Sequence, residues 1–315
     1  MDLTGITNEN EFYTTYYLSA MLEGDLKDLL RQWRKQEKEE GQPSPPSRLA
    51  KLAKAYFSFH EAWERAKEPQ EKMELQEAYL FQLLEALGYD LEPDWENLEN
   101  GSEIPTLGRI IKADGAPILW ILQAVDVSGE GLDPLEITLD PCQYDGRDEP
   151  SKDLFELSME QVLGKHVFAR PEPPRWVLLA SDAQLLLLDR SKWNEKRALR
   201  FDLREIFDRK ETSTLQAFAA LCHRDSLCPE DGLPLLDTLD ENSHRHAFGV
   251  SEDLKYALRE CIELLGNEAV HFLLEKRRKG VYSGGEELDP AALTRECLRF
   301  MYRILFLFYI EGRSE

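Results

Sequence analysis

The strongest hydrophobic pattern lies near the end of the chain. From Phe300 to Ile310 every residue except Arg303 is apolar or aromatic, so a helix over this segment has no polar face. A helix that is apolar all round must be covered on all sides. The segment is too short, with an arginine too near its centre, to span a bilayer comfortably. We therefore expect it to dock against a further domain or an obligate partner, through Phe300, Ile304, Leu305 and Phe308.

Apolar residues recur at helical spacing through the first ninety residues. This spacing predicts helices over residues 12–22, 26–40, 49–63 and 75–87. Gly24 and Asp25 interrupt the pattern between the first two helices, and Gly88 is suited to end the fourth. From residue 250 onward the pattern is helical again, up to the apolar segment.

The middle of the chain has the pattern of strands. Residues 106–112 and 118–125 predict two strands joined at Asp114-Gly115, a strong hairpin signal. Three more strands are predicted over residues 176–180, 185–188 and 199–202. Residues 126–156 hold ten acidic residues against Arg147 and Lys152, and predict an acidic loop or insertion.

Together these patterns predict an α+β (mixed α/β) fold with a mixed sheet of about five strands flanked by helices. We expect three parts: an N-terminal helical region over residues 1–70, an α/β domain over residues 71–212 that contains the insertion, and a helical region over residues 213–315. The last region would lead to a downstream domain that these residues do not include.

The chain has 315 residues and a net charge of −22. This acidity disfavours non-specific DNA binding, which depends on lysine and arginine at the phosphates. The five cysteines are irregularly spaced, and the N-terminus lacks the basic and apolar segments of a signal peptide. We expect free thiols, a cytoplasmic location and no membrane association.

One arrangement resembles a catalytic site. Nucleases of the PD-(D/E)xK type hold a divalent metal between an Asp and an acid-x-Lys on successive strands. Here Asp114 lies at the turn, the preceding helix offers Glu77, and Gln123-Ala124-Val125 stands where acid-x-Lys is needed. Because glutamine is neutral and valine has no charge, the pattern predicts a nuclease-like scaffold without nuclease activity. Lys112 is the one lysine we consider as a replacement, and a plain turn at Asp114 explains the pattern equally well.

Two other groups of residues are weaker candidates. Cys222-His223, Cys228 and His244-Arg245-His246 contain zinc-ligand residue types, but their spacing departs from the common short motifs, and we predict no metal site. A basic cluster is a weak candidate for nucleic-acid binding; cations that stabilise a helix C-terminus are the simpler explanation. The cluster comprises Lys276, Arg277, Arg278 and Lys279.

Several segments resemble one protein family, the large adenine-specific DNA methyltransferases of type IIG-like restriction–modification systems, found in phage-defence systems such as DISARM and BREX. The segments lie at residues 12–18, 114–120, 175–179, 246–255 and 298–311. In that family the last helix leads into the methyltransferase domain. The resemblance therefore implies that this chain corresponds to the N-terminal, nuclease-like part of such an enzyme.

The resemblance implies S-adenosylmethionine as the cofactor of the downstream domain, not of this chain. The family's catalytic Asn-Pro-Pro-Tyr/Phe motif is absent here. We therefore expect a non-catalytic module that positions DNA or partner subunits for the methyltransferase domain. A stand-alone acidic interaction or regulatory protein with a degenerate nuclease fold is the alternative, and an active metal-dependent endonuclease is a third and weaker one.

Overall fold

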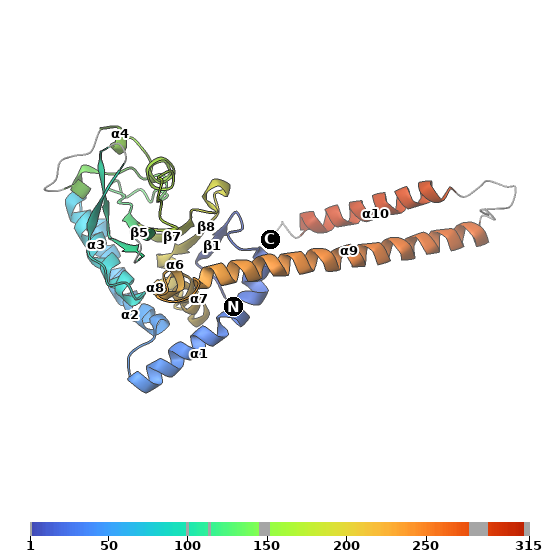
Figure 1. The fold of residues 1–315 in the computed structure, drawn as a ribbon, viewed down its shortest axis with the longest axis horizontal. Coiled ribbons are helices and arrows are strands. Elements are labelled where there is room, and N and C mark those ends of the chain that lie inside the picture. Colours follow the sequence, from blue (N-terminus) through green and yellow to red (C-terminus); the bar gives the residue numbers. More distant parts are fainter. Residues whose placement is uncertain (1, 99–100, 113–114, 145–151, 277–288, 312–315) are drawn as a thin grey trace. The chain divides into compact units, whose positions relative to one another are not determined.

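The computed structural model describes residues 2–98, 101–112, 115–144, 152–276 and 289–311 (Figure 1). The chain forms two compact units, residues 1–243 and residues 244–315. The first unit is an α+β structure built on a mixed sheet, and the second is helical. The predicted fold class is confirmed at this level, with more strands than the five that the sequence predicts.

The main sheet of the first unit has six strands in the order β1-β8-β7-β6-β5-β4. Only β5 and β6 pair in parallel, and the other neighbours are antiparallel. The predicted hairpin forms, with Ile110 paired to Leu119 across β4 and β5. The strands are β1 (Ile6–Glu9), β4 (Gly108–Ile111), β5 (Pro117–Gln123), β6 (Trp176–Ala180), β7 (Gln184–Asp189) and β8 (Ala198–Asp202).

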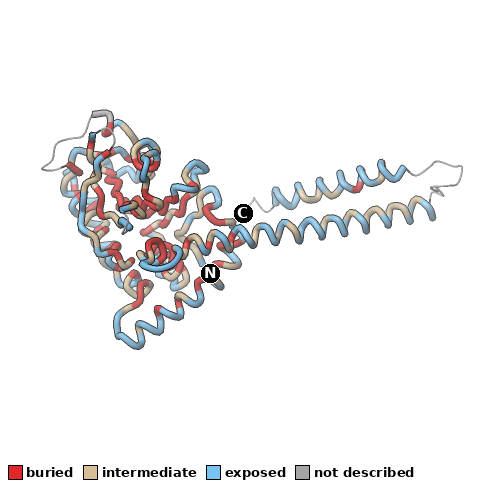
Figure 2. Tube along the Cα trace, in the orientation of Figure 1, coloured by how far each residue is buried: buried red, intermediate tan, exposed pale blue. Residues whose placement is uncertain are grey.

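The central strands are apolar on both faces. Along β5, Leu119 and Ile121 belong to one hydrophobic core, and Trp120 and Leu122 belong to a second core on the other side. This alternation follows from the two-residue period of a strand. Both faces of the sheet therefore require a covering layer. Figure 2 shows that the central strands are buried.

Helices cover the first face. Their apolar residues join those of the sheet in the larger core, which includes Tyr56, Tyr79 and Phe207. Aromatic rings pack closely here, with Phe59 stacked on Tyr79 at a centroid distance of 4.8 Å. The helices are α1 (Leu22–Glu40), α2 (Pro45–Arg65), α3 (Pro69–Ala86), α6 (Leu203–Arg209), α7 (Thr212–Cys222) and α8 (Arg224–Leu227).

The acidic segment covers the second face. Its apolar residues Ile137, Leu139 and Tyr144 pack in the second core with Trp120, Leu122 and other residues of the sheet. The segment contains a 3₁₀ turn at Pro141–Tyr144 and the short helices α4 (Lys152–Phe155) and α5 (Met159–Val162). The described residues of the predicted loop or insertion therefore help to cover the second face of the sheet.

Three short strands are not predicted from the sequence, and the predicted helix break at Gly24 is wrong. Ile6–Glu9 forms a strand paired with β8, and Asp94–Asn97 (β2) pairs with Glu103–Thr106 (β3) in a second, two-stranded sheet. Gly24 lies inside α1, which continues from a π-helical turn at Tyr17–Met21 without a break. Glycine in a helix interior costs only about 1 kcal/mol, which the buried apolar residues on either side outweigh. His244–His246 lies in helix α9 (Leu235–Lys276).

The second unit consists of the rest of α9 and of α10 (Pro290–Glu311). Cys297 is the buried side chain of α10. Large apolar side chains are exposed on both helices, among them Phe248, Leu264, Phe300 and Phe308. Figure 2 shows that most residues of these helices are exposed.

Among the described residues, no helix is both long enough and apolar enough to cross a membrane.

Gly88 ends α3 with a positive φ of 85°, as predicted for this position. The backbone N–H of Tyr89 donates to the carbonyl of Leu84, which closes a left-handed helix cap. A Cβ atom at Gly88 would lie 2.7 Å from Nε2 of His223. We expect Gly88→Ala to lower the free energy of unfolding by about 2 kcal/mol, from the left-handed backbone and the close contact together.

Gly24 provides the matched control in urea unfolding experiments. It lies inside α1, and nothing lies within 4 Å of the position a Cβ would occupy. Gly24→Ala should raise the free energy of unfolding by about 0.5–1 kcal/mol. Equal effects of the two substitutions would contradict the described cap.

Candidate functional site

Two of the predicted nuclease positions, Glu77 and Gln123, line the same cavity, of about 170 Å³. Glu77 comes from α3, and Gln123 is the last residue of β5. Gln143, on the 3₁₀ turn of the acidic segment, donates a hydrogen bond from Nε2 to the Gln123 carbonyl (3.4 Å). We call this the Glu77–Gln123 cavity. Its lining residues are Met73, Glu77, Pro93, Asp94, Trp95, Pro105, Thr106, Leu107, Gln123, Cys142 and Gln143.

The polar groups of this cavity are mostly neutral. Burial, with a contribution from nearby Glu74, raises the pKa of Glu77 above its ordinary value. Gln123 is buried, and its Oε1 has no hydrogen-bond partner. The other carboxylate, Asp94, is ion-paired with Arg109. The cavity therefore combines one carboxyl of raised pKa with side-chain amides, a set that can hydrogen-bond a small polar ligand.

The hairpin turn lies at the opposite end of β5 from this cavity. Asp114 itself is outside the described residues. Its described neighbours Lys112 and Gly115 form the turn before β5, where the Gly115 N–H donates to the Lys112 carbonyl (2.9 Å). Strands rise about 3.3 Å per residue, so the seven residues of β5 separate this turn from Gln123 by roughly 20 Å. Lys112 therefore cannot replace the missing lysine beside Gln123.

A polar cluster that the sequence analysis missed lies beyond the carboxyl ends of β5 and β6. His60, on α2, places Nε2 at 3.7 Å from Oδ2 of Asp182 and Nδ1 at 3.2 Å from Oε1 of Glu64. Burial raises the pKa of Asp182, and the neighbouring His60 opposes that shift. The cluster lies at the end of the parallel strand pair where open α/β sheets bind ligands. No local motif joins residues so far apart in sequence.

Two further residues fix the same region. Asp126 is buried and accepts hydrogen bonds from the backbone N–H groups of Gly129, Gly131 and Leu132, at 3.0, 2.8 and 3.2 Å. Lys72 donates to the Val127 carbonyl (3.1 Å). These bonds hold the start of the acidic segment against α3, so Asp126 has a clear structural role.

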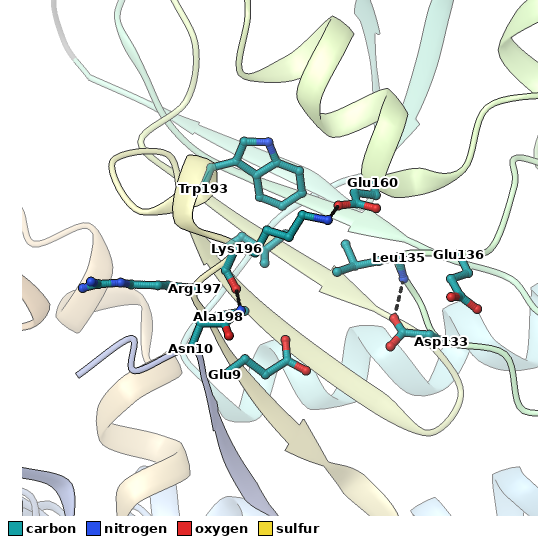
Figure 3. Close-up of a pocket in the computed structure, with 11 residues that line it drawn as sticks. Glu9, Asn10, Asp133, Leu135, Glu136, Glu160, Trp193, Lys196, Arg197 and Ala198 are labelled. Atoms are coloured by element: carbon teal, nitrogen blue, oxygen red, sulfur yellow. Dashed lines mark hydrogen bonds and ion pairs between the residues drawn. The ribbon is translucent and has the colours of Figure 1, made fainter. Parts of the chain in front are cut away.

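The larger cavity in Figure 3, of about 380 Å³, lies at the other edge of the sheet. We call it the Trp193 cavity. In Figure 3, Lys196 extends below Trp193 and its ammonium pairs with Glu160 (3.0 Å). Arg200, next to this cavity, pairs with Glu9 and with Asp133, each at 2.9 Å. Most of its charges are thus already paired within the protein, and these ion pairs connect β1, β8 and the acidic segment.

The cysteine and histidine residues weighed as zinc ligands have other surroundings. Cys222, His223 and Cys228 are buried, and the His223 ring lies 5.4 Å from the Trp33 ring. Burial raises the pKa of the Cys222 thiol and raises that of Cys228 to about 12. Within the described ranges, no three His, Cys, Asp or Glu side chains come together as a metal site.

The remaining predicted residues lie in the second unit. In the basic cluster, Lys276 is the last residue of α9, and Arg277, Arg278 and Lys279 lie outside the described residues. In the predicted docking set, Phe300 and Phe308 are 51% and 63% exposed, whereas Ile304 and Leu305 are partly buried.

No protein-family model, curated protein or solved structure matches this chain.

The buried ring of His223 leads to a prediction of how the free energy of unfolding depends on pH. Burial lowers its pKa from 6.5 to about 4, so the folded protein holds the ring neutral. Its Nδ1 accepts a hydrogen bond from the Asp225 N–H (3.2 Å), as a neutral ring can. The unfolded chain binds a proton on the His223 ring more tightly than the folded protein does. The free energy of unfolding is therefore highest above pH 6.5 and falls as the pH decreases towards 4. The loss should be about 2–3 kcal/mol.

Urea unfolding at a series of pH values tests this prediction. His223→Gln should flatten the dependence between pH 6.5 and 4, whatever its effect on stability at neutral pH. His271→Gln is the matched control, because His271 is exposed on α9. An unchanged slope in His223→Gln would show that other groups cause the acid sensitivity.

Proposed function

We propose that this chain is a non-catalytic module of an adenine-specific DNA methyltransferase of a restriction–modification or phage-defence system. Its task would be to position partner subunits or DNA for a methyltransferase domain that binds S-adenosylmethionine. The proposal combines the resemblance of five sequence segments with the surface properties of the second unit.

The exposed apolar surface of α10 carries this proposal. Phe300, Tyr302, Phe306, Leu307 and Phe308 are each more than half exposed. Exposed apolar side chains gathered on one helix are typical of a protein–protein interaction site. Aromatic residues are also the usual anchors of such interfaces. We therefore assign α10 as the docking element for the methyltransferase domain.

The Glu77–Gln123 cavity supports a non-catalytic role. A PD-(D/E)xK site needs two acids and a lysine around one metal, whereas this cavity offers Gln123 where the second acid is needed. The buried Val125 occupies the position where the lysine would stand. We interpret the first unit as a nuclease-like scaffold in which no nuclease site is assembled, since the hairpin turn also lies at the opposite end of β5 from this cavity.

The charge distribution favours partner subunits over DNA. Residues 1–243 hold 48 of the 60 acidic residues and 27 of the 38 basic ones, so nearly all the net negative charge lies there. Such a surface repels the phosphate backbone. The same property supports the alternative function, an acidic interaction or regulatory protein that binds a basic partner.

The docking prediction concerns Phe300 and Phe308. The methyltransferase domain of the same system should bind the full chain, and the double variant Phe300→Ser/Phe308→Ser should weaken binding about 10–100-fold, because buried aromatic anchors contribute about 1–3 kcal/mol each. Tyr16→Ser is a control, since Tyr16 is equally exposed (55%) but lies in the first unit. Titration calorimetry measures the affinities. Equal binding by the double variant and the wild type would rule out α10 as the docking element.

A second prediction concerns the isolated chain. It should transfer no methyl group from S-adenosylmethionine to plasmid DNA and should not cleave plasmid with Mg²⁺ or Mn²⁺. Binding to a duplex at physiological salt should be weaker than about 10⁻⁴ M, the weak limit of non-specific binding. Metal-dependent cleavage that is lost in Asp114→Ala would instead identify an active endonuclease.

A further inference from the structure

Within the second unit, helix α9 carries an apolar stripe that is exposed to solvent. Leu254 and Leu264 are 49% and 60% exposed. Ala257 and Cys261, which lie between them, are exposed as well. The four residues follow one another at spacings of three, four and three, which places them on one side of the helix. We call them the α9 seam.

A neighbouring stripe of the same helix differs in burial. Leu258, Ile262 and Leu265 also follow helical spacing, but they are partly buried. A helix with apolar residues on so wide a face has more apolar surface than its own chain covers. The α9 seam is the part of this face that stays in water.

The spacing of the α9 seam indicates which kind of element fits it. Alternating steps of three and four residues are the a and d positions of a heptad repeat. Leu254 and Cys261 lie at a positions, and Ala257 and Leu264 lie at d positions. Side chains at a and d pack between those of a second helix. The seam extends over about 15 Å of α9, so the contact is a short one.

Two carboxylates border the α9 seam on one side. Asp253 and Glu260 are exposed, and each directly precedes an a position, which is position g of the heptad. Neither is ion-paired with a residue in the described part of the chain, and the nearby cations of α9 pair with other acids. Residues at e and g pair across a coiled coil and determine the choice of partner. The seam therefore favours a helix with lysine or arginine beside its apolar stripe.

A third carboxylate lies in line with the α9 seam. Glu268 is exposed and occupies the a position that follows Leu264. Phe272, which is 53% exposed, lies one turn further along. A carboxylate that a partner covers needs a cation opposite it, because an unpaired charge removed from water costs free energy. The partner helix should therefore carry a basic residue at this point too.

A second copy of this chain does not meet these requirements. In an antiparallel pair of α9 helices the g positions of the two copies face each other, so Asp253 and Glu260 meet carboxylates. In a parallel pair in register, Glu268 faces its own counterpart. The net charge of −22 on each chain adds further repulsion.

We propose that the α9 seam binds a basic amphipathic helix of a partner protein. The four residues of the seam pack against the apolar stripe of that helix. Asp253 and Glu260 pair with lysine or arginine side chains beside the stripe. This surface is separate from Phe300 and Phe308 on α10, and the proposal does not depend on docking to the methyltransferase domain.

Calorimetric titration of the full chain with synthetic helical peptides tests the chemistry of the partner. The basic peptide consists of three repeats of Leu-Ala-Ala-Leu-Lys-Ala-Lys, with leucine at a and d and lysine at e and g. One control peptide has glutamate for every lysine, and the other has alanine for every leucine. We expect the basic peptide to bind at least about 10-fold more tightly than either control, because it alone matches both the apolar seam and its charges.

Variants locate the site. Leu254→Ser/Leu264→Ser should weaken binding of the basic peptide about 10-fold, since both leucines lose apolar area to bury. Leu233→Ser is the matched control, because Leu233 is 78% exposed but lies in the first unit, and it should leave binding unchanged. All three leucines are exposed, so these variants should fold normally, and circular dichroism checks this.

The carboxylates are tested in the same way. Asp253→Asn/Glu260→Gln should weaken binding of the basic peptide about 3–5-fold at low ionic strength, as expected for two ion pairs near the surface. Asp28→Asn/Glu39→Gln removes two exposed carboxylates of α1 and is the control for net charge. This control should leave the affinity unchanged.

Cys261 reports directly on where the peptide binds. The basic peptide at saturation should slow alkylation of this exposed thiol by N-ethylmaleimide at least about 5-fold, because the covered sulfur is less accessible to the reagent. Mass spectrometry of the digested protein measures the rate. An unchanged rate would overturn the proposal.

Four further results would overturn the proposal. They are no measurable binding of the basic peptide, equal binding of the basic and alanine peptides, equal binding of the basic and glutamate peptides, and full affinity in Leu254→Ser/Leu264→Ser. Sedimentation of the chain alone tests the other occupant. A dimer that is lost in Leu254→Ser/Leu264→Ser would identify a second copy on the α9 seam and would also overturn the proposal.

Discussion

The two-sided hydrophobic character of β5, β6 and β7 determines the architecture of the first unit. Leu178 and Leu187 pack in one core, while Val177 and Leu186 pack in the other. A sheet of this kind loses stability on whichever face is left in water, because each exposed leucine or valine forgoes about 1.5–3 kcal/mol of burial. The helices α1 to α3 and α6 to α8 cover only one face. The chain therefore needs a second layer, and residues 126–168 are the part that provides it.

This requirement explains how a segment with ten acidic residues can be structural. Ile137 and Leu139 alternate with the exposed residues Glu136 and Thr138, so one side of the segment packs on the sheet and the other faces solvent. Asp126 is the exception among these acidic residues, because its carboxylate is buried. It accepts hydrogen bonds from backbone N–H groups at the start of the segment. Hydrogen bonds from three amides and from the hydroxyl of Ser128 keep the pKa of Asp126 below its ordinary value despite burial.

Elements with strong local periodicity could be predicted from the sequence, and those that depend on distant partners could not. The strands β4 to β8 and the helices α2 and α3 follow from apolar spacing and from turn residues such as Gly88. Ile6–Glu9 has one apolar residue in four, and becomes a strand only because β8 offers an unpaired edge. The misplaced break at Gly24 has the opposite cause, since burial of Leu22 and Leu26 outweighs the helix propensity of a single glycine.

The same distinction applies to the candidate sites. Glu77 and Gln123 could be selected from the pattern of a nuclease hairpin, and they do share a cavity. Lys112 is also close to Gln123 in sequence. Because β5 is extended, however, Lys112 lies at the end of this strand opposite to Gln123. His60 and Asp182 meet only through the packing of α2 on the sheet.

The charges of the two units suit different tasks. Residues 244–315 hold 12 acidic and 11 basic residues, so the helices with the largest exposed apolar side chains are almost neutral, whereas residues 1–243 are strongly acidic. Charged residues are depleted in the centre of protein–protein interfaces, because desolvating them opposes binding. A large net charge elsewhere keeps the protein dispersed through mutual repulsion. An acidic first unit therefore limits self-association of a chain whose helix α10 carries exposed apolar side chains.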